Sequence, residues 1–129
     1  MQIALPVWRG RISPLLDTAG HLLVVEMDGR HETARRQEAL SGRILQERAA
    51  VISGLGCDWV ICGAVSREMA IMLAALDVRL LPWVAGEVDE IITAFAEGRL
   101  TGGRFMMPGF RLRGRRRGRR RAGRWPYAP

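Results

Sequence analysis

Few side chains in this sequence could act as a nucleophile, a general base or a metal ligand. The 129 residues include two histidines, His21 and His31, and two cysteines, Cys57 and Cys62. We expect the histidines at opposite ends of a hairpin, so they cannot converge on one reacting group. The cysteines are farther apart than in a metal-binding knuckle and enclose an apolar stretch, which favours small buried residues in or beside a strand. The pattern predicts a protein that is not an enzyme.

The serines and glycines form no catalytic or nucleotide-binding motif. None of the four serines lies in a nucleophile-elbow sequence, and helix capping explains Ser41 and Ser66. All twenty basic residues are arginine, so the lysine of a phosphate-binding loop is absent. Gly54 and Gly56 end a predicted helix instead of opening one. These observations exclude a serine hydrolase, a GTPase and a dinucleotide-dependent dehydrogenase.

The most promising position for a binding site is the stretch from Cys62 to Ser66, where a buried strand is expected to meet a helix N-terminus. Free backbone N–H groups at such a junction attract an anion. Cys62, Gly63 and Ser66 are the candidate contacts there, and the loop from Ser13 to Asp17 is a second candidate. A tight turn that only needs a small residue explains the same sequence without a ligand, and this alternative stays open.

The elements that must position these residues follow from hydrophobic periodicity and from glycine and proline signals. Asp28-Gly29 predicts a hairpin with a type I′ turn, whose polar return strand lies at a sheet edge. Ser41 is the expected N-cap of the first helix. In chain order we expect strands over 1–8, 21–27 and 30–38, a helix over 41–55, a strand over 58–62, a helix over 66–75, a strand over 78–83 and a helix over 86–97. The β-α-β-α order at the end predicts parallel strands with right-handed crossovers.

The positive charge of the chain is concentrated near its C-terminal end. The formal net charge is +7, yet residues 111–129 contain nine arginines and no acid, so residues 1–110 carry 11 basic and 13 acidic residues. We expect one domain over residues 1–103, then a linker and a disordered arginine-rich tail over 104–129. Such a tail can bind nucleic acid or an acidic surface without sequence preference and with strong salt dependence.

Export and membrane insertion are not expected. Pro6, Arg9 and Arg11 interrupt the apolar start of the chain, which therefore lacks the pattern of a signal peptide. The longest apolar runs are far shorter than the roughly 18 residues that span a bilayer. Two cysteines make no disulfide framework. The sequence predicts a cytoplasmic protein without a membrane partner.

Several segments together resemble a known family, the dinitrogenase iron-molybdenum cofactor biosynthesis domain. The resemblance covers roughly residues 1–110. It rests on Ile3-Ala4-Leu5-Pro6-Val7, on Arg11-Ile12-Ser13-Pro14-Leu15-Leu16-Asp17-Thr18-Ala19, on Val60-Ile61-Cys62-Gly63-Ala64-Val65-Ser66 and on Arg104-Phe105-Met106-Met107-Pro108-Gly109 before the basic tail. This family includes nitrogenase accessory proteins and many small stand-alone relatives.

The resemblance implies a three-layer α/β/α fold of the ribonuclease H-like kind, without nuclease activity. Its mixed sheet has about five strands, one of them antiparallel. Relatives that work with nitrogenase bind an iron-sulfur cofactor precursor and hand it on, in some of them through a histidine in the loop after the first strand. Leu15 stands at the matching position here, and Phe110 stands where many stand-alone relatives place a cysteine.

Two functional hypotheses follow. The first is a non-catalytic accessory or carrier protein that binds or delivers an iron-sulfur or iron-molybdenum cofactor precursor, with a cluster donor or acceptor protein as partner. Its expected contacts are Ser13, Asp17, His21, Cys62, Gly63 and Ser66, with Cys62 and His21 as metal ligands. The alternative is an interaction module without a cluster, which binds protein through its folded part and nucleic acid or an acidic surface through residues 111–129.

Overall fold

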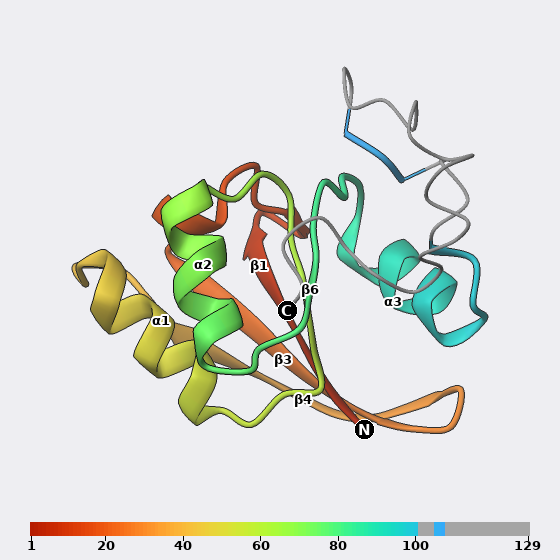
Figure 1. Ribbon diagram of the computed structural model, residues 1–129. Coiled ribbons are helices and arrows are strands. Elements are labelled where there is room, and N and C mark those ends of the chain that lie inside the picture. The colour runs from red at the N-terminus through yellow and green to blue at the C-terminus, as the bar shows by residue number, and fades with distance from the viewer. Residues whose placement is uncertain (101–104, 108–129) are drawn as a thin grey trace, which may run out of the picture.

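The computed structural model describes residues 1–100 and 105–107, which form a mixed β-sheet and three α-helices (Figure 1). The sheet has the strand order β4-β3-β1-β5-β6, and the short β2 pairs with β1 beside this path. The strands are β1 (Gln2–Trp8), β2 (Arg11–Ile12), β3 (His21–Asp28), β4 (His31–Ala39), β5 (Trp59–Ile61) and β6 (Leu80–Leu81); the helices are α1 (Leu45–Gly54), α2 (Arg67–Ala75) and α3 (Val88–Ala96), with one 3-10 turn, η1 (Leu16–Thr18). The predicted α/β class with a mixed sheet is confirmed.

β1 is the central strand of the sheet. It pairs antiparallel with β3 and parallel with β5, and β5 pairs parallel with β6. β4 pairs antiparallel with β3 and therefore runs in the same direction as β1. Along the path of five strands, only β3 runs in the opposite direction. β1 is buried on both faces, and its alternate residues belong to two different hydrophobic clusters. Ile3 and Leu5 belong to one cluster, and Ala4 belongs to the other.

The two faces of the sheet are covered by different helices. α1 and α2 pack on one face, where Ile52 and Leu73 join the cluster that contains Ala4. α3 packs on the opposite face, where Ile91 joins the cluster that contains Ile3. Figure 1 shows α1 and α2 on one side of the strands and α3 on the other. The described residues therefore form three layers, helices, sheet and helix.

The β3–β4 hairpin forms at the predicted place, but its turn differs from the prediction. Asp28 pairs with His31, so the turn residues are Gly29 and Arg30. Gly29 has a φ of 63°, whereas Arg30 is not among the described residues with positive φ. This sign pattern is that of a type II′ turn, since the expected type I′ turn needs positive φ at both central residues. β4 lies at the edge of the sheet, as predicted.

α1 begins later than predicted, and Ser41 does not cap it. The N-cap residue is Ile44, whose N–H donates to Glu47 Oε1 at 3.0 Å. The Ser41 hydroxyl donates instead to Gly20 O at 3.4 Å. A carboxylate three residues into the helix satisfies an otherwise free backbone N–H, so the first turn closes without a serine cap.

The folded part includes residues beyond the expected boundary at 103. Phe105 is only 4% exposed and belongs to the cluster under α3, and its carbonyl accepts from Ala85 N–H at 2.7 Å. The predicted tail lies almost wholly outside the described residues, so its disorder stays a prediction. No helix in residues 1–100 or 105–107 is long and apolar enough to cross a membrane.

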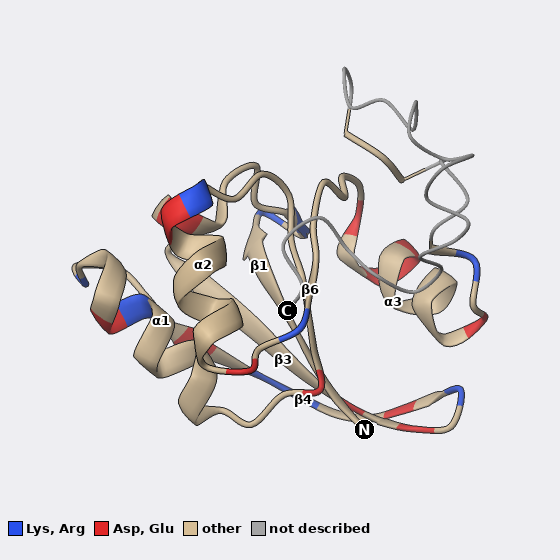
Figure 2. Cartoon of the chain, in the orientation of Figure 1, with Lys and Arg blue, Asp and Glu red and all other residues tan. Residues whose placement is uncertain are grey.

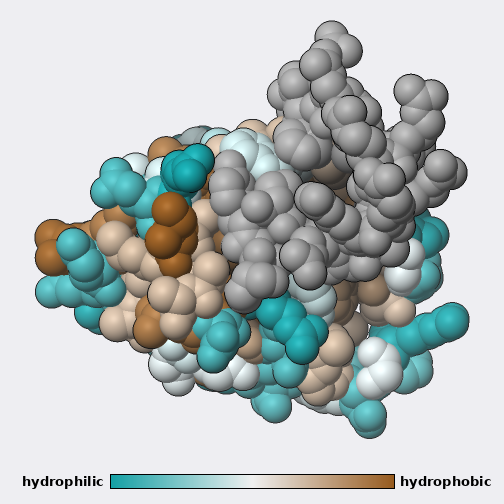
Figure 3. Space-filling view, viewed as in Figure 1, coloured by the Kyte–Doolittle hydropathy of each residue, from teal (hydrophilic) through white to brown (hydrophobic). Residues whose placement is uncertain are grey.

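The helical layer of α1 and α2 exposes single hydrophobic side chains. Ile44, Ile71 and Leu76 are 62%, 56% and 46% exposed. Figure 3 shows hydrophobic residues scattered among hydrophilic ones over this side of the molecule. Isolated apolar residues are ordinary on a protein surface and do not define a docking site.

Candidate functional site

Two segments that are distant in sequence meet at the carboxyl end of β5. Leu15 forms a parallel β-bridge with Ala64. The Leu16 N–H donates to Ala64 O at 2.9 Å, and the Ala64 N–H donates to Pro14 O at 2.8 Å. The loop after β2 is thus bonded through its backbone to the turn between β5 and α2. Five of the six predicted contact residues lie on these two segments: Ser13, Asp17, Cys62, Gly63 and Ser66.

The N-terminus of α2 already holds an anion, which is the protein's own Asp17. Asp17 Oδ1 accepts from Ser66 N–H at 2.9 Å, and the Ser66 hydroxyl donates to Asp17 Oδ2. Ser66 caps α2, as predicted, because its Oγ accepts from Met69 N–H at 3.1 Å. A helix N-terminus favours a negative charge, and here a side chain supplies it. Asp17 therefore ties the loop after β2 to the N-terminus of α2.

Gly63 allows the two segments to approach each other. A Cβ atom on Gly63 would lie 2.8 Å from Pro14 O and 2.9 Å from Ser13 O, closer than real Cβ contacts. Ser13 is buried, and its N–H donates to Pro6 O at 2.8 Å. Both residues therefore hold the backbone of the loop in place. Their contacts agree with the alternative in which the turn needs a small residue for packing.

Cys62 lies inside the hydrophobic core and offers no sulfur to a ligand. Its side chain is 0% exposed and belongs to the cluster under α1 and α2. Burial raises the pKa of the Cys62 thiol well above its usual value, and the nearby Asp17 carboxylate raises it further. A metal ligand must be a thiolate, which this environment disfavours.

His21 lies on the other face of the sheet. The next two residues, Leu22 and Leu23, belong to the clusters under α1–α2 and under α3 respectively. Because side chains alternate along a strand, His21 shares the α3 face with Leu23. Cys62 faces α1 and α2, so the structure does not bring the two predicted metal ligands together. Among residues 1–100 and 105–107 there is no group of three or more His, Cys, Asp or Glu side chains that could hold a metal ion.

His21 opens into a cavity between α3 and the β3–β4 hairpin. The cavity has a volume of about 410 Å³. Its polar and aromatic lining residues are Trp8, Arg9, His21, Arg35, Gln37 and Asp89. Trp8 is 60% exposed, and the Arg9 guanidinium lies 4.5 Å from its ring centroid. An aromatic face, one imidazole and two guanidinium groups against one carboxylate favour a small anionic ligand.

A second cavity of about 500 Å³ continues along the same groove. It is lined by Met27, His31, Glu32, Arg35, Asp89 and Ile92, among others. Figure 2 shows acidic and basic stretches along the β3–β4 hairpin and acidic stretches on α3, the two elements that border this groove. Arg35 and Asp89 line both cavities, so their ion pair marks the place where the cavities meet.

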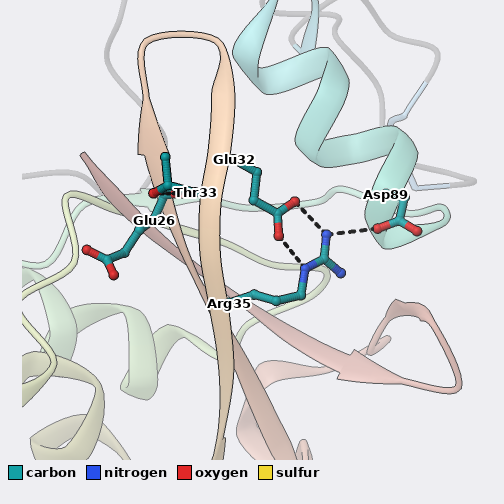
Figure 4. Close-up of polar contacts among 5 residues, drawn as sticks. All are labelled: Glu26, Glu32, Thr33, Arg35 and Asp89. Atoms are coloured by element: carbon teal, nitrogen blue, oxygen red, sulfur yellow. Dashed lines mark hydrogen bonds and ion pairs between the residues drawn. The ribbon is translucent and has the colours of Figure 1, made fainter.

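A β-bulge places Arg35 at this junction. Glu26 pairs with Ala34 and Met27 with Glu32, which leaves Thr33 as the extra residue; its hydroxyl donates to Glu26 O at 3.3 Å. In a regular strand, residues three apart point to opposite faces. The bulge turns Glu32 to the same face as Arg35, and the two form a forked ion pair, with Arg35 Nη2 to Glu32 Oε1 at 2.6 Å (Figure 4).

The ion pair changes the titration of both partners. The hydrogen bonds from Arg35 lower the pKa of the Glu32 carboxyl below its ordinary value, and the same pairing raises the pKa of Arg35. Both groups are therefore charged at neutral pH. Arg35 also donates from Nη2 to Asp89 Oδ1 at 3.1 Å, which ties β4 to the first turn of α3 (Figure 4).

Solved structures share this architecture, although no protein-family model and no curated protein sequence matches the chain. The crystal structure of PH0822 superposes with a TM-score of 0.73 at 17% identity, over 78% of this chain and 93% of that one. MJ0327 of Methanocaldococcus jannaschii, provisionally described as a dinitrogenase, gives 0.66 at 19% identity, over 78% and 92%. TM1290 of Thermotoga, provisionally described as a NifB protein of the DUF35 family, gives 0.61 at 19% identity, over 85% and 96%.

The chain has the fold of these proteins. At such low identities the likeness establishes the fold alone, because one fold supports many functions. Leu15, at the position where the resembling family can carry a histidine, lies opposite Ala64 in the parallel bridge described above, and its neighbours Pro14 and Leu16 make the two hydrogen bonds to Ala64.

Sequence reasoning missed the groove and its arginine. The β4 segment reads as a polar edge strand, and nothing in it distinguishes Arg35 from Arg36. The spacing of Glu32 and Arg35 would place them on opposite faces of a regular strand, so only the bulge reveals the pair. The long run of polar residues in this strand is the sequence feature that could have pointed to a site.

Labelling of the two cysteines will test the burial of Cys62. Iodoacetamide at mildly alkaline pH is expected to modify Cys57, which is partly exposed, in the native protein, and Cys62 only after unfolding in guanidinium chloride. Burial raises the pKa of both thiols, but only Cys62 is closed to the reagent. Both cysteines lie on the tryptic peptide 49–67, so fragmentation of this peptide in the mass spectrometer locates the label and measures the two rates. Equal native rates would show that Cys62 is accessible.

Proposed function

We propose that this protein is a non-catalytic carrier that binds an anionic iron-sulfur cofactor precursor as cargo in the first cavity, the one lined by His21, between α3 and the β3–β4 hairpin. The observation that carries the proposal is the position of His21. Of the six contacts predicted from sequence, His21 lines the first cavity, and Arg9 and Arg35 line it too. The fold it shares with MJ0327 and TM1290, with their provisional dinitrogenase and NifB descriptions, supports the choice of cargo.

The side chains of the cavity suit a transiently bound cluster rather than a permanently bound one. Iron-sulfur centres are held by several cysteine thiolates or, less often, imidazoles. Here one imidazole is available, and the described residues place no thiol in the cavity. Cationic side chains attract an anionic cluster without bonding to iron, so a cluster held in this way can be passed on. We propose a cluster donor protein and a cluster acceptor protein as partners, in the reducing cytoplasm.

The three layers and the single reversed strand β3 support a ribonuclease H-like arrangement for this carrier. The sequence predicts a protein that is not an enzyme, and hydrolysis is not part of the proposal. The alternative function, binding of nucleic acid or an acidic surface through residues 111–129, stays a prediction because that segment lies outside the described residues.

The test is cluster uptake under anaerobic conditions. Protein purified anaerobically is mixed with a synthetic thiolate-ligated iron-sulfur cluster, desalted, and assayed for iron, sulfide and its visible spectrum. The wild-type chain is expected to retain cluster, and His21→Ala to reduce the affinity about tenfold or more, since it removes the one candidate ligand. His31→Ala is the matched control, because His31 lies at the opposite end of the hairpin in the second cavity. Cys62→Ala is expected to leave uptake unchanged.

Three results would count against the proposal. A wild-type protein that stays colourless would exclude cluster carriage. Equal losses in His21→Ala and His31→Ala would show that uptake does not depend on the first cavity. A loss in Cys62→Ala with His21→Ala unaffected would move the site to the turn between β5 and α2.

A further inference from the structure

The guanidinium group of Arg35 in the groove is held in a fixed orientation, and only some of its N–H groups donate to recorded acceptors. Nε and Nη2 of Arg35 donate to the two carboxylate oxygens of Glu32, and Nη2 also donates to Asp89. In the part of the chain that the structure describes, no acceptor is recorded for Nη1, which carries two further N–H donors. Arg35 lines both cavities, so these donors border the groove.

The two carboxylates that hold Arg35 differ in how firmly they are held. The Glu32 side chain is 27% exposed and binds in a two-point fork, whereas the Asp89 side chain is 81% exposed and contributes one contact. A forked pair fixes the plane of the guanidinium, while a highly exposed single contact contributes little. Asp89 can therefore leave Arg35 at small cost, and Glu32 cannot.

We propose that Arg35 is a pre-oriented anion-binding residue and that Asp89 is its internal competitor. A small, multiply charged anion displaces the Asp89 carboxylate from Nη2 and accepts from Nη1, while Glu32 keeps the guanidinium in place. The ligand class is a compact anion with several acceptor atoms, either a phosphate-type oxyanion or a sulfide-rich metal cluster. The inference rests on the proposed function only in the choice of the second of these.

The electrostatics of the first cavity agree with this role. Arg9 and His21 line it on the side of β1 and β3, and Asp89 is its one acidic lining residue. An anion that takes the place of the Asp89 carboxylate would therefore meet Arg9, His21 and Arg35, beside the Glu32 carboxylate that keeps Arg35 in place. Fixed donors cost little reorganisation on binding, which is the advantage of the bulge that orients Arg35.

Inorganic pyrophosphate is the first probe, used with the full chain and followed by residue-specific NMR. Shifts of the Trp8 indole and the His21 ring report binding in the groove alone, so arginines elsewhere in the chain do not confuse the readout. We expect Arg35→Gln to weaken this binding about tenfold or more, as expected for a charged hydrogen bond. Asp89→Asn is expected to strengthen it severalfold, because the competitor is removed.

Arg36→Gln is the matched control. Arg36 is the next residue of β4 and carries the same charge. Its Nε forms an ion pair of 3.3 Å with Glu38 Oε2, and Arg36 lines neither of the two cavities. It is expected to change the affinity less than twofold. Equal losses in Arg35→Gln and Arg36→Gln, no strengthening in Asp89→Asn, or no shift of Trp8 and His21 in the wild type would each overturn the inference.

The second arm repeats these variants with the synthetic iron-sulfur cluster. Pyrophosphate binding that depends on Arg35 without any cluster uptake would sustain the inference and remove the proposed carrier function. Cluster uptake that depends on His21 but is unaffected by Arg35→Gln and Asp89→Asn would sustain the carrier function and overturn the inference for that ligand.

Discussion

Gly63→Ala is expected to lower the free energy of unfolding by about 3 kcal/mol, at the upper end of the range for overpacking. The added Cβ would lie 2.8 Å from Pro14 O and 2.9 Å from Ser13 O, and both are backbone atoms that cannot turn away. To relieve the clash, the loop after β2 must move away from the turn between β5 and α2. The bonds between Ala64 and its partners in the loop would then lengthen or break. Urea unfolding followed by circular dichroism measures the change.

Gly54→Ala is the control for this substitution. Gly54 is the last residue of α1, and a Cβ atom added there would meet no other atom within 4 Å. Alanine is favoured over glycine in a helix by up to about 1 kcal/mol, so this variant is expected to be neutral or slightly more stable. A Gly63→Ala protein as stable as Gly54→Ala would show that the two segments are not packed as closely as described.

Asp17→Ala is expected to cost about 2–3 kcal/mol of stability, because it removes a charged acceptor from two donors at once. Ser66 N–H and the Ser66 hydroxyl would both lose their partner, and α2 would lose the negative charge at its N-terminus. Asp17→Asn keeps the shape and one acceptor, so a smaller loss is expected. Thermal unfolding of the two variants, with hydrogen exchange of Ser66 and its neighbours, measures the effect.

Asp28→Ala is the matched control for the removal of an aspartate. Asp28 is exposed at the end of β3, and no side-chain hydrogen bond to it is recorded among the described residues. Its removal is expected to change stability by less than about 0.5 kcal/mol, as for most surface substitutions. If Asp17→Ala and Asp28→Ala behaved alike, Asp17 would be an ordinary surface carboxylate, and the N-terminus of α2 would be open to another anion.

These two predictions separate a structural site from a binding site. The turn between β5 and α2 has the features of an anion site, but Asp17, Ser13 and Gly63 use them to hold the loop in place. The groove beside α3 has no such internal occupant among the described residues except Asp89, whose contact with Arg35 is exposed and weak. Substitutions at the turn should therefore change stability, whereas substitutions at His21 and Arg35 should change binding.

The order and type of the elements could be predicted from the sequence, because they follow from local patterns. The apolar run of the first strand, the wholly apolar run Trp59–Ile61 and the helix signals after Ser66 and Gly86 each act over a few residues. The Ser66 cap was predicted for the same reason. The errors were also local. Glu47, and not Ser41, accepts the backbone N–H at the start of α1, and Gly29 and Arg30 form the hairpin turn instead of Asp28 and Gly29.

The sequence by itself determined the α/β class, the central parallel strands and the small set of residues able to do chemistry, since each depends on residue type and short spacing. Only the tertiary structure decided which of these residues share a site. Cys62 and His21 lie on opposite faces of one sheet, a consequence of strand pairing and side-chain alternation across distant segments. The groove at Arg35 likewise depends on a bulge and on the packing of α3, because Glu32, Arg35 and Asp89 meet only after β4 and α3 have found their places on the sheet.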